Sequence, residues 1–164
     1  MPTRLNYPLA PVVARPVKAS IVVPGRAVEA EQLWYDRHRW PSWIDGFGKV
    51  VSLDDEWPQT GARLMWDAPP NSRGRVVERV TRYEPRLGQT LDWEDGLYMG
   101  VRRVTFEPGL EETRITLEVE PQPKLRVPPA QLWWFRRKLR ESLQRTLQRF
   151  SYELAAERQF GHER

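Results

Sequence analysis

The last third of the sequence contains one long amphipathic helix, which limits the folds that the chain can adopt. After Pro129, no Gly or Pro occurs until beyond Arg158. Apolar residues recur there at steps of three and four, which places them on one face of a helix with 3.6 residues per turn. They are Leu132, Phe135, Leu139, Leu143, Leu147, Phe150 and Leu154. Because this face must be buried along its length, the rest of the chain has to supply a large apolar surface.

The segments before this helix are typical of antiparallel strands. Short β-rich runs end at Pro or Gly about every 8–12 residues, as in successive hairpins. The expected strands are 19–23, 49–57, 62–67, 74–83, 89–94, 98–107 and 113–120; a helix is expected over 27–36 and a helical turn over 40–44. We therefore predict an α+β fold: a curved antiparallel sheet of about seven strands wrapped around the long C-terminal helix, with two short helices after the first strand. Such a wrap closes at one end and gapes at the other, and the gap is the expected ligand pocket.

A chain of 164 residues is predicted to form one domain. Residues 1–17 are punctuated by proline and are expected to form an extended arm. Residues 18–158 form the folded domain, and residues 159–164 a short tail. The N-terminal segment lacks a continuous apolar stretch and no run is long enough to span a membrane, so we expect a cytoplasmic protein without a transmembrane segment.

The composition argues against several kinds of chemistry. The chain has no Cys, which excludes disulfides, thiolate catalysis and Cys-ligated zinc. His38 is the only internal histidine, and no nucleophile motif accompanies it. The acidic runs 54–56 and 92–95 are expected to be solvated strand ends. We therefore expect no metal and no cofactor.

The positive charge is concentrated on the long helix. Residues 124–164 hold 10 Lys and Arg against 4 Glu (+6), whereas residues 1–123 hold 16 basic and 18 acidic residues (−2). A basic helix back could meet nucleic acid, an anionic membrane or an acidic partner. Because Glu141, Gln144 and Gln148 interrupt it, the pattern favours a solvated surface, and nucleic acid is not an expected partner.

Several segments resemble a known family. RWPSWIDGFGKVVSLD (39–54), GARLMWDAP (61–69), GRVVERVTRYEP (74–85) and VTFEPGLEETRITLEVE (104–120) are similar to segments of the START-like, or SRPBCC, superfamily. The resemblance covers about residues 18–157 and is closest to the polyketide cyclase/dehydrase-like branch. It implies the helix-grip fold. It also implies binding of a lipid, sterol, hormone or polyketide, or cyclase activity, but no shared catalytic motif carries over.

Aromatic residues are the strongest chemical signal, since the chain has 8 Trp. Trp43, Trp66, Trp93 and Phe106 lie in segments expected to face the cavity, and Phe135 lies near the start of the long helix. Aromatic rings suit a flat or lipid-like ligand, although each could instead fill an ordinary core.

Two arginines are ambiguous. Arg102 lies on the same face of its strand as Val104 and Phe106 and so points inward, unless Gly100 forms a bulge that turns it outward. Arg136 falls about 40° from Leu132 around the helix, so it either reaches the pocket mouth or snorkels to solvent.

Trp134 falls about 200° from Leu132, on the side opposite the apolar stripe. It could mark a homodimer contact, a membrane contact, or packing by the arm through Tyr7, Leu9 and Val12. Three functions thus remain open. They are binding of a hydrophobic small molecule, aromatic polyketide cyclase or dehydrase activity, and interaction with a partner or membrane through the basic helix back.

Overall fold

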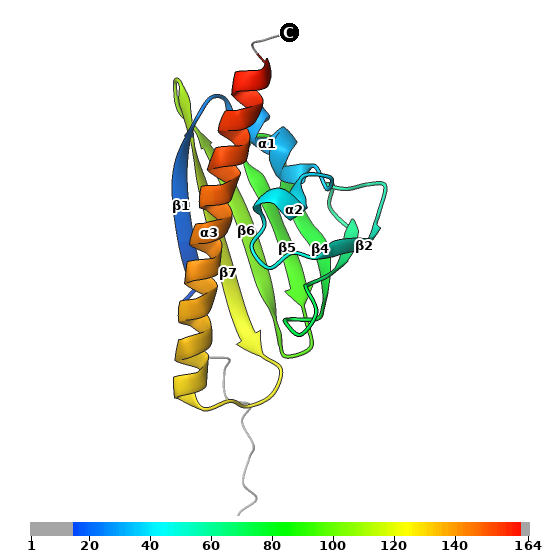
Figure 1. The fold of residues 1–164 in the computed structure, drawn as a ribbon. Coiled ribbons are helices and arrows are strands. Elements are labelled where there is room, and N and C mark those ends of the chain that lie inside the picture. Colours follow the sequence, from blue (N-terminus) through cyan, green and yellow to red (C-terminus); the bar gives the residue numbers. More distant parts are fainter. Residues whose placement is uncertain (1–14, 162–164) are drawn as a thin grey trace, which may run out of the picture.

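A seven-stranded antiparallel sheet curves around a long C-terminal helix in the computed structural model, which describes residues 15–161 (Figure 1). The strand order is β1-β7-β6-β5-β4-β3-β2, so the first strand closes the sheet beside the last. The elements are β1 (Val17–Pro24), α1 (Ala27–Tyr35), α2 (Trp40–Trp43), β2 (Lys49–Leu53), β3 (Arg63–Asp67), β4 (Arg75–Glu84), β5 (Gly88–Glu94), β6 (Tyr98–Pro108), β7 (Glu112–Pro123) and α3 (Pro129–Gly161). The predicted helix-grip fold is confirmed.

One strand boundary was predicted wrongly. The second strand was expected to reach residue 57, but β2 ends at Leu53 and a turn follows, in which the Trp57 N–H donates to the Asp54 carbonyl at 3.1 Å. The reason is that the Asp54 carboxylate accepts the Arg63 N–H at 2.9 Å and so closes the hairpin to β3. Trp57 is then free to turn inward, where its indole N–H donates to the Tyr35 carbonyl at 3.0 Å.

The longest hairpin, β6–β7, supplies the floor of the grip. Its register runs without a shift from the pair Tyr98↔Pro123 to the pair Pro108↔Thr113. Along β7, burial alternates strictly, and Ile115, Leu117 and Val119 face the helix while their neighbours face outward. The sheet therefore offers one apolar face, as the sequence pattern predicts.

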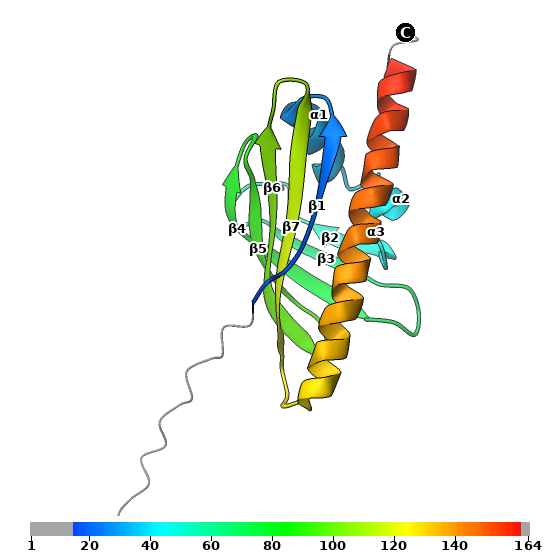
Figure 2. The same cartoon turned by 90° about the vertical axis from the view of Figure 1, so that its left-hand side faces the viewer.

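Helix α3 runs beside that face of the sheet (Figure 2). In its C-terminal half, Leu143, Leu147, Phe150 and Leu154 are buried. The earlier members of the same stripe, Leu132, Phe135 and Leu139, are only partly buried. The N-terminal half is therefore less completely covered than the C-terminal half. Within residues 15–161, no helix is both long enough and apolar enough to cross a bilayer.

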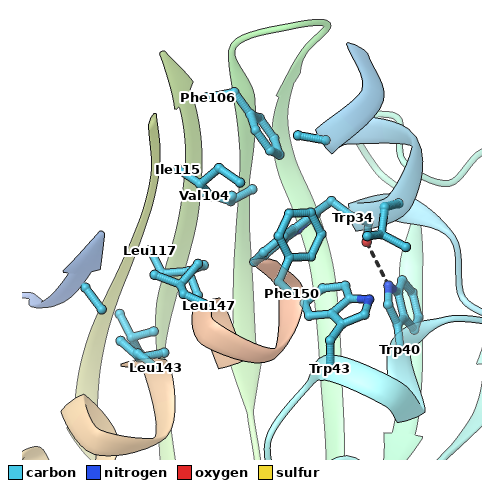
Figure 3. Close-up of a cluster of buried hydrophobic side chains, with 14 of the residues drawn as sticks. Trp34, Trp40, Trp43, Val104, Phe106, Ile115, Leu117, Leu143, Leu147 and Phe150 are labelled. Carbon is cyan, nitrogen blue, oxygen red and sulfur yellow. Dashed lines mark hydrogen bonds between the residues drawn. The ribbon is translucent and has the colours of Figure 1, made fainter. Parts of the chain in front are cut away.

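Aromatic side chains fill the closed end of the grip (Figure 3). The Trp34 ring lies 4.6 Å from Trp43 and 5.2 Å from Phe150, and Trp43 lies 5.0 Å from Phe150 (centroid distances). The Trp40 indole N–H donates to the Trp34 carbonyl at 2.8 Å, which joins α2 to α1. These offset and edge-to-face contacts fix both short helices against α3.

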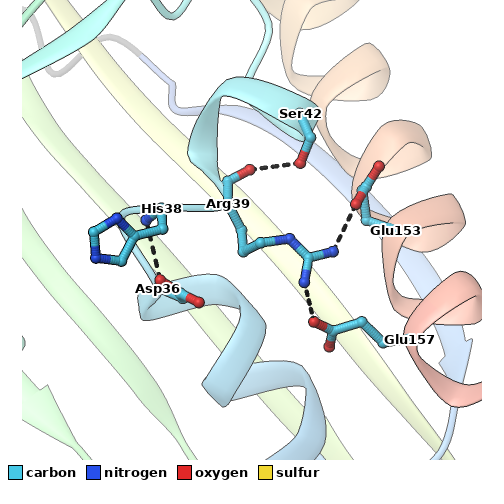
Figure 4. A network of polar contacts seen from close by, with 6 residues as sticks. All are labelled: Asp36, His38, Arg39, Ser42, Glu153 and Glu157. Atoms are coloured by element: carbon cyan, nitrogen blue, oxygen red, sulfur yellow. Dashed lines mark hydrogen bonds and ion pairs between the residues drawn. The ribbon is translucent and has the colours of Figure 1, made fainter. Parts of the chain in front are cut away.

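Two polar contacts also hold the short helices to α3. Arg39, just before α2, donates to Glu153 at 2.8 Å and also to Glu157 (Figure 4). In the same view, Asp36 accepts the backbone N–H of His38 at 3.0 Å, an Asx turn between the two helices. A role for the His38 side chain is not supported by any contact in the described part of the chain.

The loop after α2 is fastened to α3 through Asp45. Its carboxylate accepts hydrogen bonds from Ser142 at 2.7 Å and Arg145 at 3.0 Å, and it lies 3.3 Å from Arg149. Its backbone N–H donates to the Thr146 hydroxyl at 3.0 Å. Desolvation opposes ionisation, but the hydrogen bonds from Arg145 and Ser142 outweigh it and hold the pKa of Asp45 below its usual value.

The expected boundaries at the two termini can be compared with the structure only within residues 15–161. Most of the expected arm, residues 1–14, lies outside the described residues, as do Tyr7, Leu9 and Val12 and the packing proposed for them. At the other end α3 continues to Gly161, so residues 159–161, expected in the tail, are helical.

We predict that Phe150→Ala lowers the free energy of unfolding by about 3–5 kcal/mol, because the ring is fully buried between α3, Trp34 and Trp43. Phe160→Ala is the matched control, since that ring is on the same helix but 69% exposed. It should change stability by less than about 0.5 kcal/mol. Chemical denaturation followed by circular dichroism measures both; equal losses would contradict the described packing of α3.

We also predict a pH-dependent contribution from Asp45. A carboxylate whose pKa is depressed in the folded state stabilises the protein above its unfolded pKa of about 4, and this contribution disappears as the pH falls through the folded value. Asp45→Asn should therefore cost about 1 kcal/mol at neutral pH, a modest value because solvent screens half-exposed arginines. The cost should shrink below about pH 4. Asp55→Asn, at an exposed position, is the control; a cost that is independent of pH would contradict the charge argument.

Candidate functional site

A cavity of about 630 Å³ lies under the N-terminal half of α3, where the apolar stripe is only partly buried. Its walls come from α1, α2 and the following loop, from strands β3 to β7, and from α3 itself. This volume is in the range, about 300–1,000 Å³, that is typical of sites for small molecules. The predicted gap in the wrap is therefore present as a cavity.

Aromatic residues form a large part of the lining, ten of its 29 residues. Of the residues predicted for the site, Trp43, Trp66, Trp93 and Phe135 line the cavity. Tyr98 lines it as well, and the aromatic members that the sequence did not indicate are Trp34, Trp40, Phe47, Trp57 and Trp134. Most of them stand in helices or turns, where no strand alternation reveals the direction of a side chain.

Phe106 was placed in the site, but the structure does not bring it there. Its side chain faces inward as predicted and is 1% exposed. It makes edge contacts with Trp34 at 6.2 Å and Tyr35 at 6.4 Å at the closed end of the sheet. The inward direction of the Phe106 side chain was predicted correctly, but its position relative to the cavity was not. Alternation along a strand does not tell which stretch of the strand the short helices cover.

Arg102 points inward and lines the cavity. The alternative of a bulge at Gly100 is wrong, because the register of β6 with β7 is unbroken. Gly100 is instead a point of close approach, since a Cβ there would lie 1.7 Å from the Glu120 carbonyl oxygen. The guanidinium pairs with Glu78 of β4 at 3.0 Å, and that carboxylate is almost wholly buried. This pair supplies the partner that an inward arginine requires.

Arg136 does not reach the cavity. It donates a hydrogen bond to the backbone carbonyl of Arg15, immediately before β1. Neither alternative considered for it holds, because the flank of α3 that carries Leu132 and Arg136 faces the chain leading into β1. Its Nη1 atom is buried without a hydrogen-bond partner within residues 15–161.

A second ion pair, in which only the carboxylate is buried, was missed altogether. Arg73, in the loop after β3, donates to Asp95 at 2.8 Å and lies over the rings of Trp93 (4.9 Å) and Trp66 (5.4 Å). Asp95, expected to be a solvated strand end, is 8% exposed and also accepts the Tyr98 N–H at 2.8 Å. Cation–π contacts and the ion pair thus hold a charged group at an aromatic wall. The sequence shows only a polar hairpin loop there.

Two residues that line the cavity also carry hydrogen-bond donors without acceptors. The indole Nε1 atoms of Trp43 and Trp93 are buried, and neither has a partner among the residues that the structure describes. On the sheet, Trp93 pairs directly with Glu78, and Arg102 pairs with the adjacent Leu91. One of these indoles therefore belongs to the same patch of the cavity floor as the Arg102–Glu78 pair.

Tyr98 closes the lower wall. Its ring stacks on Phe135 with centroids 3.7 Å apart and planes within 6°. Burial, and to a smaller extent the nearby carboxylate of Asp95, raises the pKa of Tyr98, so its hydroxyl is protonated at neutral pH. Tyr83 does not line the cavity.

The face of α3 toward the cavity includes Phe135, Leu139 and Leu143 of the apolar stripe and extends beyond the stripe to Trp134 and Lys138. Trp134 was assigned to the outer surface, but it lines the cavity at its mouth and is 53% exposed. Lys138, one turn later, places its amino group 4.9 Å from the Trp134 ring. The basic helix back is interrupted as well, because Arg145 and Arg149 pair with Asp45 instead of facing solvent as a continuous surface.

The polar groups of the cavity do not form a recognisable metal site. Within residues 15–161, no three His, Asp or Glu side chains are grouped as ligands. What the arrangement provides is a cavity with aromatic side chains and two charge pairs on its walls, together with two buried indole N–H groups that lack acceptors within residues 15–161. Such a site can enclose an apolar molecule and bind oxygen atoms on it.

Solved structures share this architecture. A START superfamily protein from Mycobacterium smegmatis has a TM-score of 0.69 and 13% identity, with 87% of this chain and 99% of that chain covered. Norcoclaurine synthase from Thalictrum flavum has a TM-score of 0.53 and 14% identity, with coverage of 67% and 70%. At such low identities these likenesses concern the fold alone.

DynU16, from the dynemicin biosynthetic locus, is a further structural relative, with a TM-score of 0.65 and 19% identity. The match covers 87% of this chain but only 48% of DynU16. No curated protein matches the sequence. Residues 15–155, however, match the family described as polyketide cyclase / dehydrase and lipid transport. Because this match spans the whole grip, from β1 to the last turns of α3, the chain belongs to that family of the START-like, or SRPBCC, superfamily.

Proposed function

We propose that the protein binds a hydrophobic small molecule with a flat aromatic body in the cavity under α3. The observation that carries this proposal is the cavity itself, about 630 Å³ in volume, with ten aromatic residues in its lining. Rigid aromatic walls favour stacking on a planar ligand over enclosure of a flexible saturated chain. The family description, which covers both polyketides and lipids, leaves this choice open.

The polar groups define the second property of the ligand. Two residues of the cavity wall, Trp43 and Trp93, have buried indole N–H groups without an acceptor within residues 15–161. The arginines Arg73 and Arg102 are paired but still partly accessible, with side chains 38% and 26% exposed. Because a buried donor without an acceptor is costly, a ligand that fits should carry carbonyl, phenolic or carboxylate oxygens. An oxygenated, polyketide-like aromatic molecule meets both requirements.

We predict that Leu139→Trp weakens binding of an anthraquinone carboxylate by about tenfold or more, because the added ring projects from α3 into the cavity that Leu139 lines. Isothermal titration calorimetry measures the affinity, with palmitate as the saturated comparison. Gln144→Trp is the control, since it adds the same ring at an exposed position on the same helix. Equal affinities for wild type and Leu139→Trp would place binding outside the cavity, and no binding of either probe would argue against the proposal.

A second candidate is catalysis on the bound molecule, as in a polyketide cyclase or dehydrase. The observation that favours it is the Glu78 carboxylate, 3% exposed, on the cavity wall beside Arg102. A buried carboxylate beside a guanidinium could accept a proton from a ligand carbon while the cation stabilises the enolate. Turnover of a reactive poly-β-keto chain that persists in Glu78→Gln would rule out this role for Glu78.

A further inference from the structure

The end of the molecule at which the cavity opens carries a cluster of exposed apolar side chains. Leu97 (70% exposed) lies in the β5–β6 turn, Leu125 (78%) in the loop before α3, and Trp133 (60%) and Trp134 (53%) in the first turns of α3. The two loops lie side by side, because the Lys124 N–H donates to the Leu97 carbonyl at 2.9 Å. We call these four apolar residues the mouth surface. Contiguous exposed apolar surface of this kind marks an interaction site.

The mouth surface is surrounded by positive charge. Residues 121–140 contain no Asp or Glu. The cations of this segment are Lys124, Arg126, Arg136, Arg137, Lys138 and Arg140. Lys124 and Arg137 have carboxylate partners, at 3.0 and 3.7 Å. In the described part of the chain, Arg126, Lys138 and Arg140 make no ion pair.

Cations and exposed rings are also in direct contact. The Arg137 guanidinium lies 5.7 Å from the Trp133 ring, and the Lys138 amino group lies 4.9 Å from the Trp134 ring. Indole rings beside Lys and Arg are the side chains that favour the boundary between lipid headgroups and acyl chains. Each such cation near an anionic membrane adds further attraction.

We propose that the mouth surface docks on an anionic phospholipid bilayer. The leucines and tryptophans enter the headgroup region, and the unpaired cations contact lipid phosphates and carboxylates. Charge complementarity favours this occupant over two others. A second copy of the chain would bring like charges together. Residues 1–14 carry only one charged side chain, Arg4, and no acidic residue, so they cannot neutralise the surface.

Docking in this orientation would present the cavity to the bilayer, because Leu97, Trp134 and Lys138 belong both to this end of the molecule and to the cavity lining. A hydrophobic molecule could then pass from membrane to cavity without crossing water. This consequence rests on the proposed function. The docking itself does not, because it depends only on the outer surface.

Vesicle flotation of the full-length protein tests the proposal. Vesicles of phosphatidylcholine with about 30% phosphatidylserine should carry the protein upward, and vesicles of phosphatidylcholine alone should carry about tenfold less. Raising NaCl to about 0.5 M should release it, because salt screens the headgroup contacts. Absence of flotation with the anionic vesicles would overturn the proposal.

The double variant Leu125→Ser/Trp133→Ser removes apolar surface from residues that do not line the cavity. It should reduce binding to anionic vesicles by about tenfold or more. Phe160→Ser is the matched control, an equally exposed aromatic residue at the opposite end of α3, and should bind as wild type does. Leu139→Trp should also float normally, which separates a failure of docking from a failure of ligand binding.

Analytical ultracentrifugation of the same proteins tests the competing occupant. The proposal expects the oligomeric state to be the same in wild type and in Leu125→Ser/Trp133→Ser. A wild-type dimer that this double variant converts to a monomer would identify the mouth surface as a self-association interface and overturn the proposal.

Discussion

The structure depends on how far one amphipathic helix can approach a curved sheet. The C-terminal half of α3 is locked down by Leu147, Phe150 and Leu154, and the aromatic cluster of α1 and α2 fills the space beside it. In the N-terminal half the stripe is less completely buried, and there the ring of Phe135 stacks on that of Tyr98. A cavity is the direct result, since the same stripe is buried at one end and only partly buried at the other.

The charged pairs in this cavity cost stability. Moving Arg102 and Glu78 out of water is repaid only in part by their attraction, and apolar replacements of similar size are often as stable or more stable. In the second pair only Asp95 is buried, and two backbone N–H groups also bind its carboxylate, while Arg73 stays partly exposed. We infer that these pairs are kept for the specificity of the site. They place polar atoms at fixed points of an otherwise aromatic surface, where they can select the position of oxygen atoms on a ligand.

Much of this could be predicted from the sequence where a periodic pattern was present. Alternation along the strands correctly turned Trp66, Trp93 and Arg102 inward, and the spacing of α3 gave the buried stripe. Patterns of this kind show which way a side chain points but not whether it lies at the cavity or at the closed end of the grip, which is why Phe106 was misplaced. The Arg73–Asp95 pair joins two loops that are separate in the sequence. Trp134 lines the mouth of the cavity because the helix face toward the cavity extends beyond the apolar stripe. Both depend on tertiary packing that no local pattern reports.

The central claim is that the free indole donors in the cavity bind acceptor oxygens of a planar ligand. The most direct measurement is an NMR titration that follows the indole N–H protons of Trp43 and Trp93, assigned by single Trp→Phe variants. With an anthraquinone carboxylate, both resonances should shift to higher frequency as hydrogen bonds form, while the resonance of Trp133 stays in place. Saturation of the protein with no change at Trp43 or Trp93 would contradict the account.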